Sequence, residues 1–214
     1  MKRLLIGLIG LVALTTSSCA LSMLATALPK DLIYQKVDCP TDGKVKAENL
    51  QVVSTQKWAQ GIVVLYSALC PGRSQKAPML TIFGHKVVKR NGISWQISGG
   101  DSYGTKDPEG ASDQLVEYGI SKSTTQSNRY TVLYGQVLKP KVAAVEATFN
   151  NGKILRDWSN NGAFVLVAPG ATGVCELRLL GSDNQILRQE DLAVPKQFAR
   201  EGQAQQCLPV SHQL

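Results

Sequence analysis

The chain has 214 residues, of which 43% are hydrophobic and only 18% charged, so an intrinsically disordered protein is excluded and one large or two small domains are expected. The formal net charge is +7, and Lys2 and Arg3 supply two of these charges. Apart from two short groups, the basic residues are scattered singly, which excludes a dedicated nucleic-acid interface and favours general attraction to anionic lipid or polysaccharide. These groups are Lys86, Lys89 and Arg90, and Lys139 and Lys141.

The N-terminus has the three parts of a secretion signal. Lys2 and Arg3 are followed by an apolar stretch, Leu4 to Leu14, and then by small residues that end at Cys19. The arrangement resembles a bacterial lipoprotein signal, in which such a cysteine is lipid-modified and becomes the first residue. The sequence departs from that pattern at Thr16 and Ser18, where a leucine and a glycine or alanine are usual.

Two alternatives to lipidation at Cys19 remain open. Ala25-Thr26-Ala27 is a cleavage site of the A-x-A kind, which would release a soluble protein that begins at Leu28. Residues 4–29 also carry no charge and are numerous enough to span a bilayer of about 30 Å as an uncleaved anchor. All three alternatives predict an exported protein of the cell envelope, either membrane-anchored or periplasmic or extracellular, with residues 1–27 as the signal.

Four further cysteines fit two disulfides, as expected in an oxidising compartment. No two of them lie closer than about 30 residues, whereas zinc sites usually contain a pair two to four residues apart. Four cysteines allow three connectivities, of which we favour the two local pairs, with the crossed patterns and buried free thiols as alternatives. The four residues are Cys39, Cys70, Cys175 and Cys207, and the favoured pairs are Cys39–Cys70 and Cys175–Cys207.

From residue 50 onwards, short β-type runs alternate with turn residues, which is typical of a sandwich or barrel. The expected strands are 50–55, 61–68, 79–84, 86–90, 93–98, 115–120, 130–138, 142–149, 153–158, 163–168, 174–180 and 185–190. Asn91-Gly92, Asn151-Gly152 and Asn161-Gly162 each separate two runs, and Asn-Gly tolerates the positive φ that tight hairpins need. The sequence therefore predicts three hairpins.

The second half of the chain shows the clearest strand patterns. Val145, Ala147 and Phe149 alternate with polar residues, which predicts a half-buried strand. Ala163 to Ala168 is apolar throughout, which predicts a central strand covered on both faces. The only expected helix beyond the signal is a short one within 196–206.

We therefore expect an all-β fold, an antiparallel sandwich or barrel-like structure, in a single domain over 28–214. The alternative is two subdomains divided near 99–129, because residues 99–113 form a polar, Gly-rich stretch that predicts a long loop or linker.

The segment from about residue 134 to 190 resembles exported, lipoprotein-like β-sandwich proteins of bacteria whose function is uncharacterised. The resemblance lies in Tyr134-Gly135, in the run from Val145 to Gly152, and in the run from Asn161 to Gly170. It implies a sandwich in an exported protein and no functional residues.

Gly100-Asp101-Ser102-Tyr103-Gly104 matches the G-x-S-x-G pattern of serine hydrolases. That pattern requires a turn from a strand into a helix, and residues 105–110 are poor helix formers. The histidine base would be His212, close to the C-terminus, while His85 is expected to be a partly exposed turn residue. No phosphate loop, metal-ligand spacing or cofactor motif is present, so we expect no cofactor, metal or catalytic residue.

Two further groups of residues have both a functional and a structural interpretation. Acidic residues in a Gly-rich loop are possible Ca²⁺ ligands, but their spacing matches no calcium loop, so we expect a solvated acidic loop. The tryptophans are candidates for stacking on sugars, but core packing is the favoured interpretation, with Trp158 as the most exposed. The acidic residues are Asp101, Asp107, Glu109, Asp113 and Glu117, and the tryptophans are Trp58, Trp95 and Trp158.

These observations favour a non-enzymatic envelope protein that acts as a binding or structural module, with another envelope protein or a polymer as its partner and a membrane attachment through its N-terminus. Two alternatives stay open. One is an exported serine hydrolase that uses Ser102 and His212, and the other is a carrier of a small apolar ligand in an unfilled β-sandwich or barrel.

Overall fold

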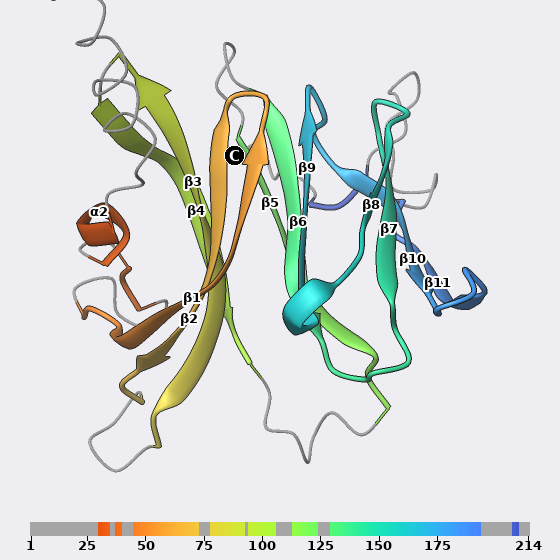
Figure 1. Cartoon of the computed structure of the whole chain (residues 1–214), viewed down its shortest axis with the longest axis horizontal. Helices are drawn as coiled ribbons and strands as arrows, with labels where there is room; N and C mark the ends of the chain where they lie inside the picture. The colour runs from red at the N-terminus through yellow and green to blue at the C-terminus, as the bar shows by residue number, and fades with distance from the viewer. Residues whose placement is uncertain are drawn as a thin grey trace, which may run out of the picture.

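The computed structural model describes residues 30–34, 37–39, 45–72, 78–92, 94–105, 113–123, 129–193 and 207–209. Within them the fold is all-β, as predicted. Three antiparallel sheets pack against one another as layers, and none closes into a barrel (Figure 1). No helix in this part of the chain is long and apolar enough to cross a membrane. The signal, Cys19, His212 and the helix expected within 196–206 lie outside the described residues.

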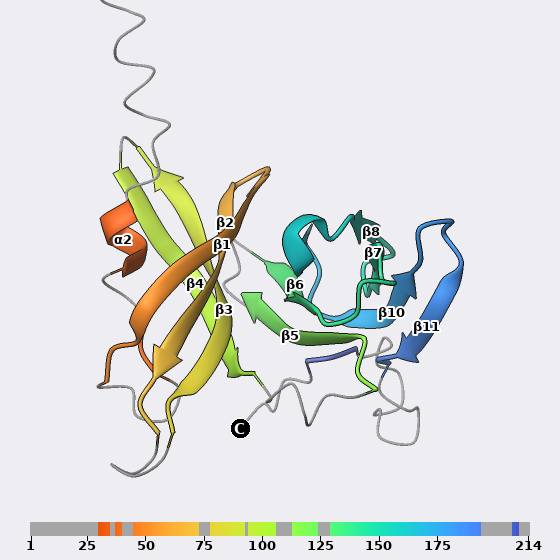
Figure 2. The same cartoon turned by 60° about the horizontal axis from the view of Figure 1, so that its bottom comes forward.

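The first sheet is a meander of four long strands that pair in sequence order. Its outer face is covered by a short helix, in which Ile33 packs against Val64 and Val88 (Figure 2). The helix is α2 (Lys30–Tyr34), and the strands are β1 (Glu48–Trp58), β2 (Gly61–Cys70), β3 (Leu80–Asn91) and β4 (Ser94–Gly104).

The remaining strands form a two-sheet sandwich. One sheet has the order β5-β6-β9 and the other the order β11-β10-β7-β8, which is a Greek-key arrangement like that of immunoglobulin-type sandwiches, with the fourth strand paired in the second sheet. The strands are β5 (Val116–Ser123), β6 (Tyr130–Val137), β7 (Ala144–Phe149), β8 (Ile154–Asp157), β9 (Ala163–Pro169), β10 (Val174–Leu180) and β11 (Ile186–Asp191), with the 3-10 turn η2 (Asn160–Gly162) before β9.

The β5-β6-β9 sheet is the middle layer, because it is packed on both faces. Val132 and Val165 face the first sheet, whereas Leu133 and Leu166 face the β11-β10-β7-β8 sheet. The apolar strand β9 is therefore covered on both faces, as predicted. The central position expected for it was wrong, because β9 pairs only with β6 and is an edge strand of its sheet, where packing from the two flanking sheets buries its side chains. The alternation of Val145, Ala147 and Phe149 also places one face of β7 in the core, as predicted.

Three predictions about local structure were wrong. Residues 79–84 and 86–90 form one strand, since Gly84 is accommodated beneath the ring of Tyr66, where an added Cβ would lie 2.6 Å from the ring. The loop expected from residue 99 begins after Gly104, because Gly99 to Gly104 continue the pairing with β3. The first sheet and the sheet that contains β5 are therefore joined by a shorter link, between the end of β4 and the start of β5.

The third error concerns the hairpins. Gly92 and Gly152 have positive φ and join paired strands, β3 to β4 and β7 to β8, so these two hairpins are confirmed. Asn161 and Gly162 also have positive φ, at 71° and 70°, but they join strands in different sheets. At this position the left-handed conformation turns the chain across the sandwich instead of reversing it within a sheet.

Candidate binding site at the tip of the first sheet

The first sheet has a pronounced excess of positive charge. Residues 49–100 contain no aspartate or glutamate, and their basic residues are Lys57, Arg73, Lys76, Lys86, Lys89 and Arg90. The sheet's two acidic residues, Glu48 and Asp101, pair with Leu69 and His85, far from the β1–β2 turn. At the end of the sheet where the β1–β2 and β3–β4 turns lie, no acidic side chain of the sheet offsets the basic residues.

We call this end the basic tip and define it by Lys57, Trp58, Gln60, Lys89, Arg90 and Trp95. The register brings these residues together, because Gly61 lies opposite Lys89, while Arg90 lies opposite Trp95. The two turns lie at the same end of the sheet, at the top of Figure 1. Three strands and the β1–β2 turn thus contribute to one small area of surface.

On the inner side of the tip, Lys89 lies over two aromatic rings. Its Nζ is 5.3 Å from the centroid of the Trp58 ring and 4.8 Å from that of Tyr130, a residue of the middle layer. It also donates a hydrogen bond of 3.1 Å to Oε1 of Gln60. Partial burial lowers the pKa of Lys89 below its ordinary value. Such cation–π contacts contribute about 0.5–1 kcal/mol at exposed positions and fix the direction of the ammonium group.

On the outer side, a cleft of about 360 Å³ runs between the two turns. Its lining includes Lys57, Ile62, Arg90 and Trp95, and it contains no acidic residue. Ile62 and Trp95 also pack against the apolar cluster around Ile33, so the floor of the cleft is fixed by the core of the sheet. Trp58 and Gln60 complete the rim.

The chemistry of this area suits an anionic, hydroxyl-rich ligand. Lysine and arginine side chains pair with carboxylates or phosphates, and the guanidinium of arginine can bind both oxygens of a carboxylate. An indole offers a flat apolar face, and the Gln60 amide offers both a donor and an acceptor. Together these groups match the features of a charged sugar.

The tryptophans were expected to pack in the core, and the structure shows a mixed outcome. Trp58 and Trp95 are partly buried and pack against separate core clusters, yet both also line the cleft. Trp158 is 48% exposed, as predicted, and Arg156 lies over its ring at 5.5 Å. The contact of Trp58 with Lys89 and the position of Trp95 opposite Arg90 were not predicted, although the acid-free run over 49–100 was a signal that could have revealed a basic surface.

Ser102 does not lie on a turn from a strand into a helix. It lies within the extended strand β4, where its hydroxyl hydrogen-bonds to Tyr66 and its backbone N–H donates to Oδ1 of Asp101. Burial raises the pKa of Tyr66 to about 12, an effect opposed by the hydrogen bond from Ser102. His212 lies outside the described residues. The local structure around Ser102 therefore lacks the geometry that the G-x-S-x-G pattern requires.

The structure instead pairs a different serine with a different histidine. Nε2 of His85 lies 3.0 Å from Oγ of Ser121, and the ring of His85 contacts that of Tyr134 at a centroid distance of 4.3 Å. His85 is buried within β3, so the prediction of a partly exposed turn residue was wrong. Burial, reinforced by the neighbouring Lys86, lowers the pKa of His85 to about 3.

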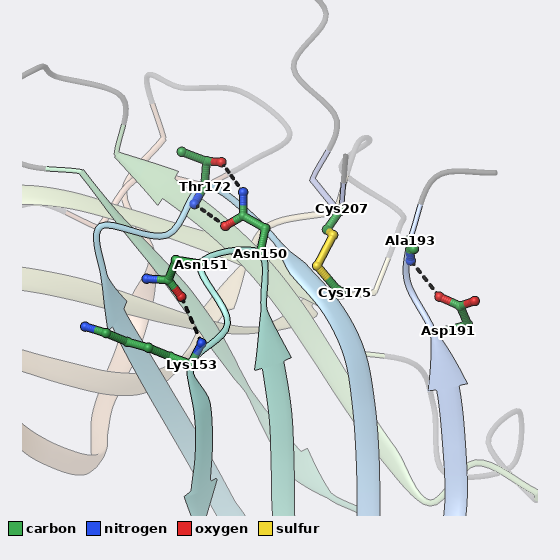
Figure 3. Close-up of a disulfide and its surroundings, with 8 residues drawn as sticks. All are labelled: Asn150, Asn151, Lys153, Thr172, Cys175, Asp191, Ala193 and Cys207. Atoms are coloured by element: carbon green, nitrogen blue, oxygen red, sulfur yellow. Dashed lines mark hydrogen bonds between the residues drawn. A yellow bond between two sulfur atoms is a disulfide. The ribbon is translucent and has the colours of Figure 1, made fainter. Parts of the chain in front are cut away.

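Both favoured disulfides are confirmed. Cys39 pairs with Cys70 at the end of β2, and Cys175 on β10 pairs with Cys207 beyond β11 (Figure 3). Each closes a loop of about 30 residues, and the arrangement indicates an oxidising compartment.

A larger cavity, of about 500 Å³, lies between β4, β5 and β11. Four of its polar side chains are already hydrogen-bonded or ion-paired. Tyr118 donates to Glu190, which also binds Arg188, and the Tyr103 hydroxyl donates to the Glu117 carbonyl. This polar, internally paired lining differs from the apolar interior that a carrier of apolar ligands needs.

The acidic residues considered as calcium ligands do not gather in the described part of the chain. Asp107 and Glu109 lie outside it, Asp101 lies on β4, and Glu117 is buried on β5. No group of three or more His, Cys, Asp or Glu residues that could hold a metal occurs among the described residues.

No protein-family model, curated protein or solved structure matches the chain.

Proposed function

We propose that this protein is a non-enzymatic binding module of the cell envelope, which holds an anionic polysaccharide at the basic tip of the first sheet. The observation that carries the proposal is the cleft between Lys57, Arg90 and Trp95, which combines two cations and an indole without any acidic residue. The sequence supports an exported location through its N-terminal signal, and the two disulfides fit an oxidising compartment.

A polysaccharide fits the tip better than a lipid surface does. Membrane-binding faces insert large apolar side chains next to their basic residues. Among the described residues, the large hydrophobic side chains that are exposed all lie elsewhere. They are Tyr34, Val52, Met79, Ile154, Trp158, Ile186 and Leu208. The tryptophans of the tip are anchored in the core instead, as suits a fixed stacking surface.

The test compares binding of soluble polygalacturonate, neutral dextran and phosphatidylglycerol vesicles to the exported protein by calorimetry. The triple variant Lys57→Gln, Lys89→Gln and Arg90→Gln removes three positive charges from the tip. Its control, Lys139→Gln with Lys141→Gln, removes one half-buried and one exposed charge from the β6–β7 connection. We expect polygalacturonate to bind wild type and control and to lose at least about tenfold in affinity with the triple variant, more strongly at low salt.

Three results would refute the proposal. One is binding of the vesicles but not of polygalacturonate, which would assign the tip to a membrane. The second is binding of dextran as strong as that of polygalacturonate, and the third is an equal loss of affinity in the triple variant and in the control.

A further inference from the structure

The contact between the first sheet and the middle layer is held by side-chain packing, and no disulfide crosses it. Val63 and Phe83 from the first sheet meet Val132, Tyr134 and Val165 from the sandwich in one apolar cluster. Cys39–Cys70 joins the segment before the first sheet to the end of β2, and Cys175–Cys207 joins two points of the sandwich. Neither disulfide therefore crosses this interface.

Each side of the interface has a core of its own. The first sheet keeps two clusters on its outer face, built around Tyr66 and Ile82 and around Ile33 and Val64. The sandwich keeps the large cluster between its two sheets. Loss of the interface would therefore leave both units with a buried core and a disulfide.

His85 is a buried polar residue of this interface. It is 1% exposed, and its Nε2 is satisfied by Ser121, whereas its Nδ1 is buried and has no hydrogen-bond partner. A neutral imidazole tolerates one unpaired nitrogen at a modest cost. An imidazolium donates from both nitrogens, so in this position it would bury a charge and an unsatisfied N–H.

Charged and titratable groups face His85 from the elements around it. Lys86 follows it on β3, Asp101 lies opposite it on β4, Glu117 and Ser121 belong to β5, and Tyr134 to β6. Tyr103 on β4, whose ring contacts that of Tyr134, completes the group. Burial first, and then the negative charges of Glu117 and Asp101 respectively, raise the pKa values of Tyr103 and Tyr134. These two carboxylates do not compensate for the burial of His85, because its pKa is still lowered by desolvation and Lys86.

We propose that acid opens this interface: protonation of His85 separates the first sheet from the β5-β6-β9 layer, while each unit remains folded. The closed form holds His85 neutral, with a pKa of about 3, whereas an exposed histidine has a pKa near 6.5. Between these values the open form binds a proton that the closed form does not. The free energy of opening therefore falls as the pH falls from about 6.5 towards about 3.

The experiment uses the full chain with Trp95→Phe and Trp158→Phe, so that Trp58, which contacts Tyr130 across the interface, reports alone. Its fluorescence, the radius of gyration from X-ray scattering and the far-ultraviolet dichroism are followed from about pH 7.5 to about pH 3.5. We expect a red shift of Trp58 and a larger radius while the dichroism stays β-like. In His85→Leu with Ser121→Ala the midpoint should move down by at least about one pH unit.

His212→Gln, which removes the other histidine, should open like the parent protein. Because it leaves one histidine, it also allows the His85 Cε1–H resonance to be assigned, and this resonance should titrate together with the opening. This NMR measurement decides the question even where the His85 variant does not fold. A closed interface throughout the range, an unchanged midpoint in the His85 variant, opening only with loss of β-structure, or a resonance that titrates independently of the opening would each overturn the proposal.

Discussion

Trp58 and Tyr130 lie in different sheets, yet their rings meet at a centroid distance of 5.3 Å beneath the ammonium group of Lys89. The inner side of the basic tip is therefore built across the interface between the first sheet and the sandwich. It follows that the proposed binding surface and the packing of the two units share residues, and changes at Trp58 should affect both.

Truncation of Trp58 should destabilise the protein more than truncation of Trp158. Trp58 packs against the interface core, so Trp58→Ala should lower the free energy of unfolding by about 2–3 kcal/mol through lost burial and a cavity. Trp158→Ala should cost less than about 1 kcal/mol, because the side chain is exposed and loses mainly its contact with Arg156. Urea unfolding followed by circular dichroism measures both, and equal losses would contradict the placement of Trp58.

Gly119→Ala should loosen the packing between β5 and β6. An added Cβ at Gly119 would lie 2.7 Å from the Tyr134 ring, which is buried between the sheets and has little room to move. We expect a loss of about 1–3 kcal/mol from overpacking, seen as a lower thermal midpoint in calorimetry. Gly104→Ala is the matched control, because the nearest atoms are flexible methyl groups of Leu80 at 3.2 Å. A midpoint lowered no more by Gly119→Ala than by the control would show that Tyr134 is free to move.

The two disulfides should contribute similar amounts of stability, since they close loops with sequence separations of 31 and 32 residues. Loop-closure entropy predicts that replacing either pair with alanine costs about 3–4 kcal/mol. The location of the effect should differ. Loss of Cys39–Cys70 should raise hydrogen exchange in the first sheet, and loss of Cys175–Cys207 should raise it in β10 and β11. Hydrogen exchange measured by mass spectrometry distinguishes these two patterns. A uniform increase in exchange in both variants would contradict the view that each disulfide stabilises only its own part of the structure.

Processing of the N-terminus is decided by intact mass. If Cys19 is lipid-modified, the protein from a bacterial membrane fraction should begin at Cys19 with an added diacyl or triacyl mass. Four thiols should become available for alkylation only after reduction, as the disulfides require. A chain that begins at Leu28 without lipid would contradict the anchor and leave an exported soluble protein.

The fold was predictable where a local pattern has one structural meaning. The apolar run from Ala163 to Ala168 indicated a strand covered on both faces, and the short loops that the two local cysteine pairs close favoured the observed disulfides. Asn161-Gly162 misled because positive φ permits a reversal within a sheet and a turn between sheets alike. Whether such a turn forms a hairpin or leads to another sheet depends on which strands the two flanking segments pair with.

The candidate site was less predictable because its residues are distant in sequence. His85 and Ser121 are brought together by packing between layers, so no local spacing reveals their contact. Arg90 and Trp95 meet through a hairpin that was predicted, but the approach of Lys57 depends on the alignment of β1 with β2 and of β2 with β3. The absence of acids over residues 49–100 was visible in the sequence, whereas the cleft required the register.

The most direct test of the proposed binding site is NMR of the three indole N–H groups during titration with a tetramer of galacturonate. Trp58 and Trp95 line the cleft, whereas Trp158 lies beyond β8 in the other outer sheet. We expect the Trp95 and Trp58 resonances to shift in a saturable, salt-sensitive way while the Trp158 resonance stays unchanged. Shifts confined to Trp158, or no shift at any concentration below precipitation, would contradict a polysaccharide site at the basic tip.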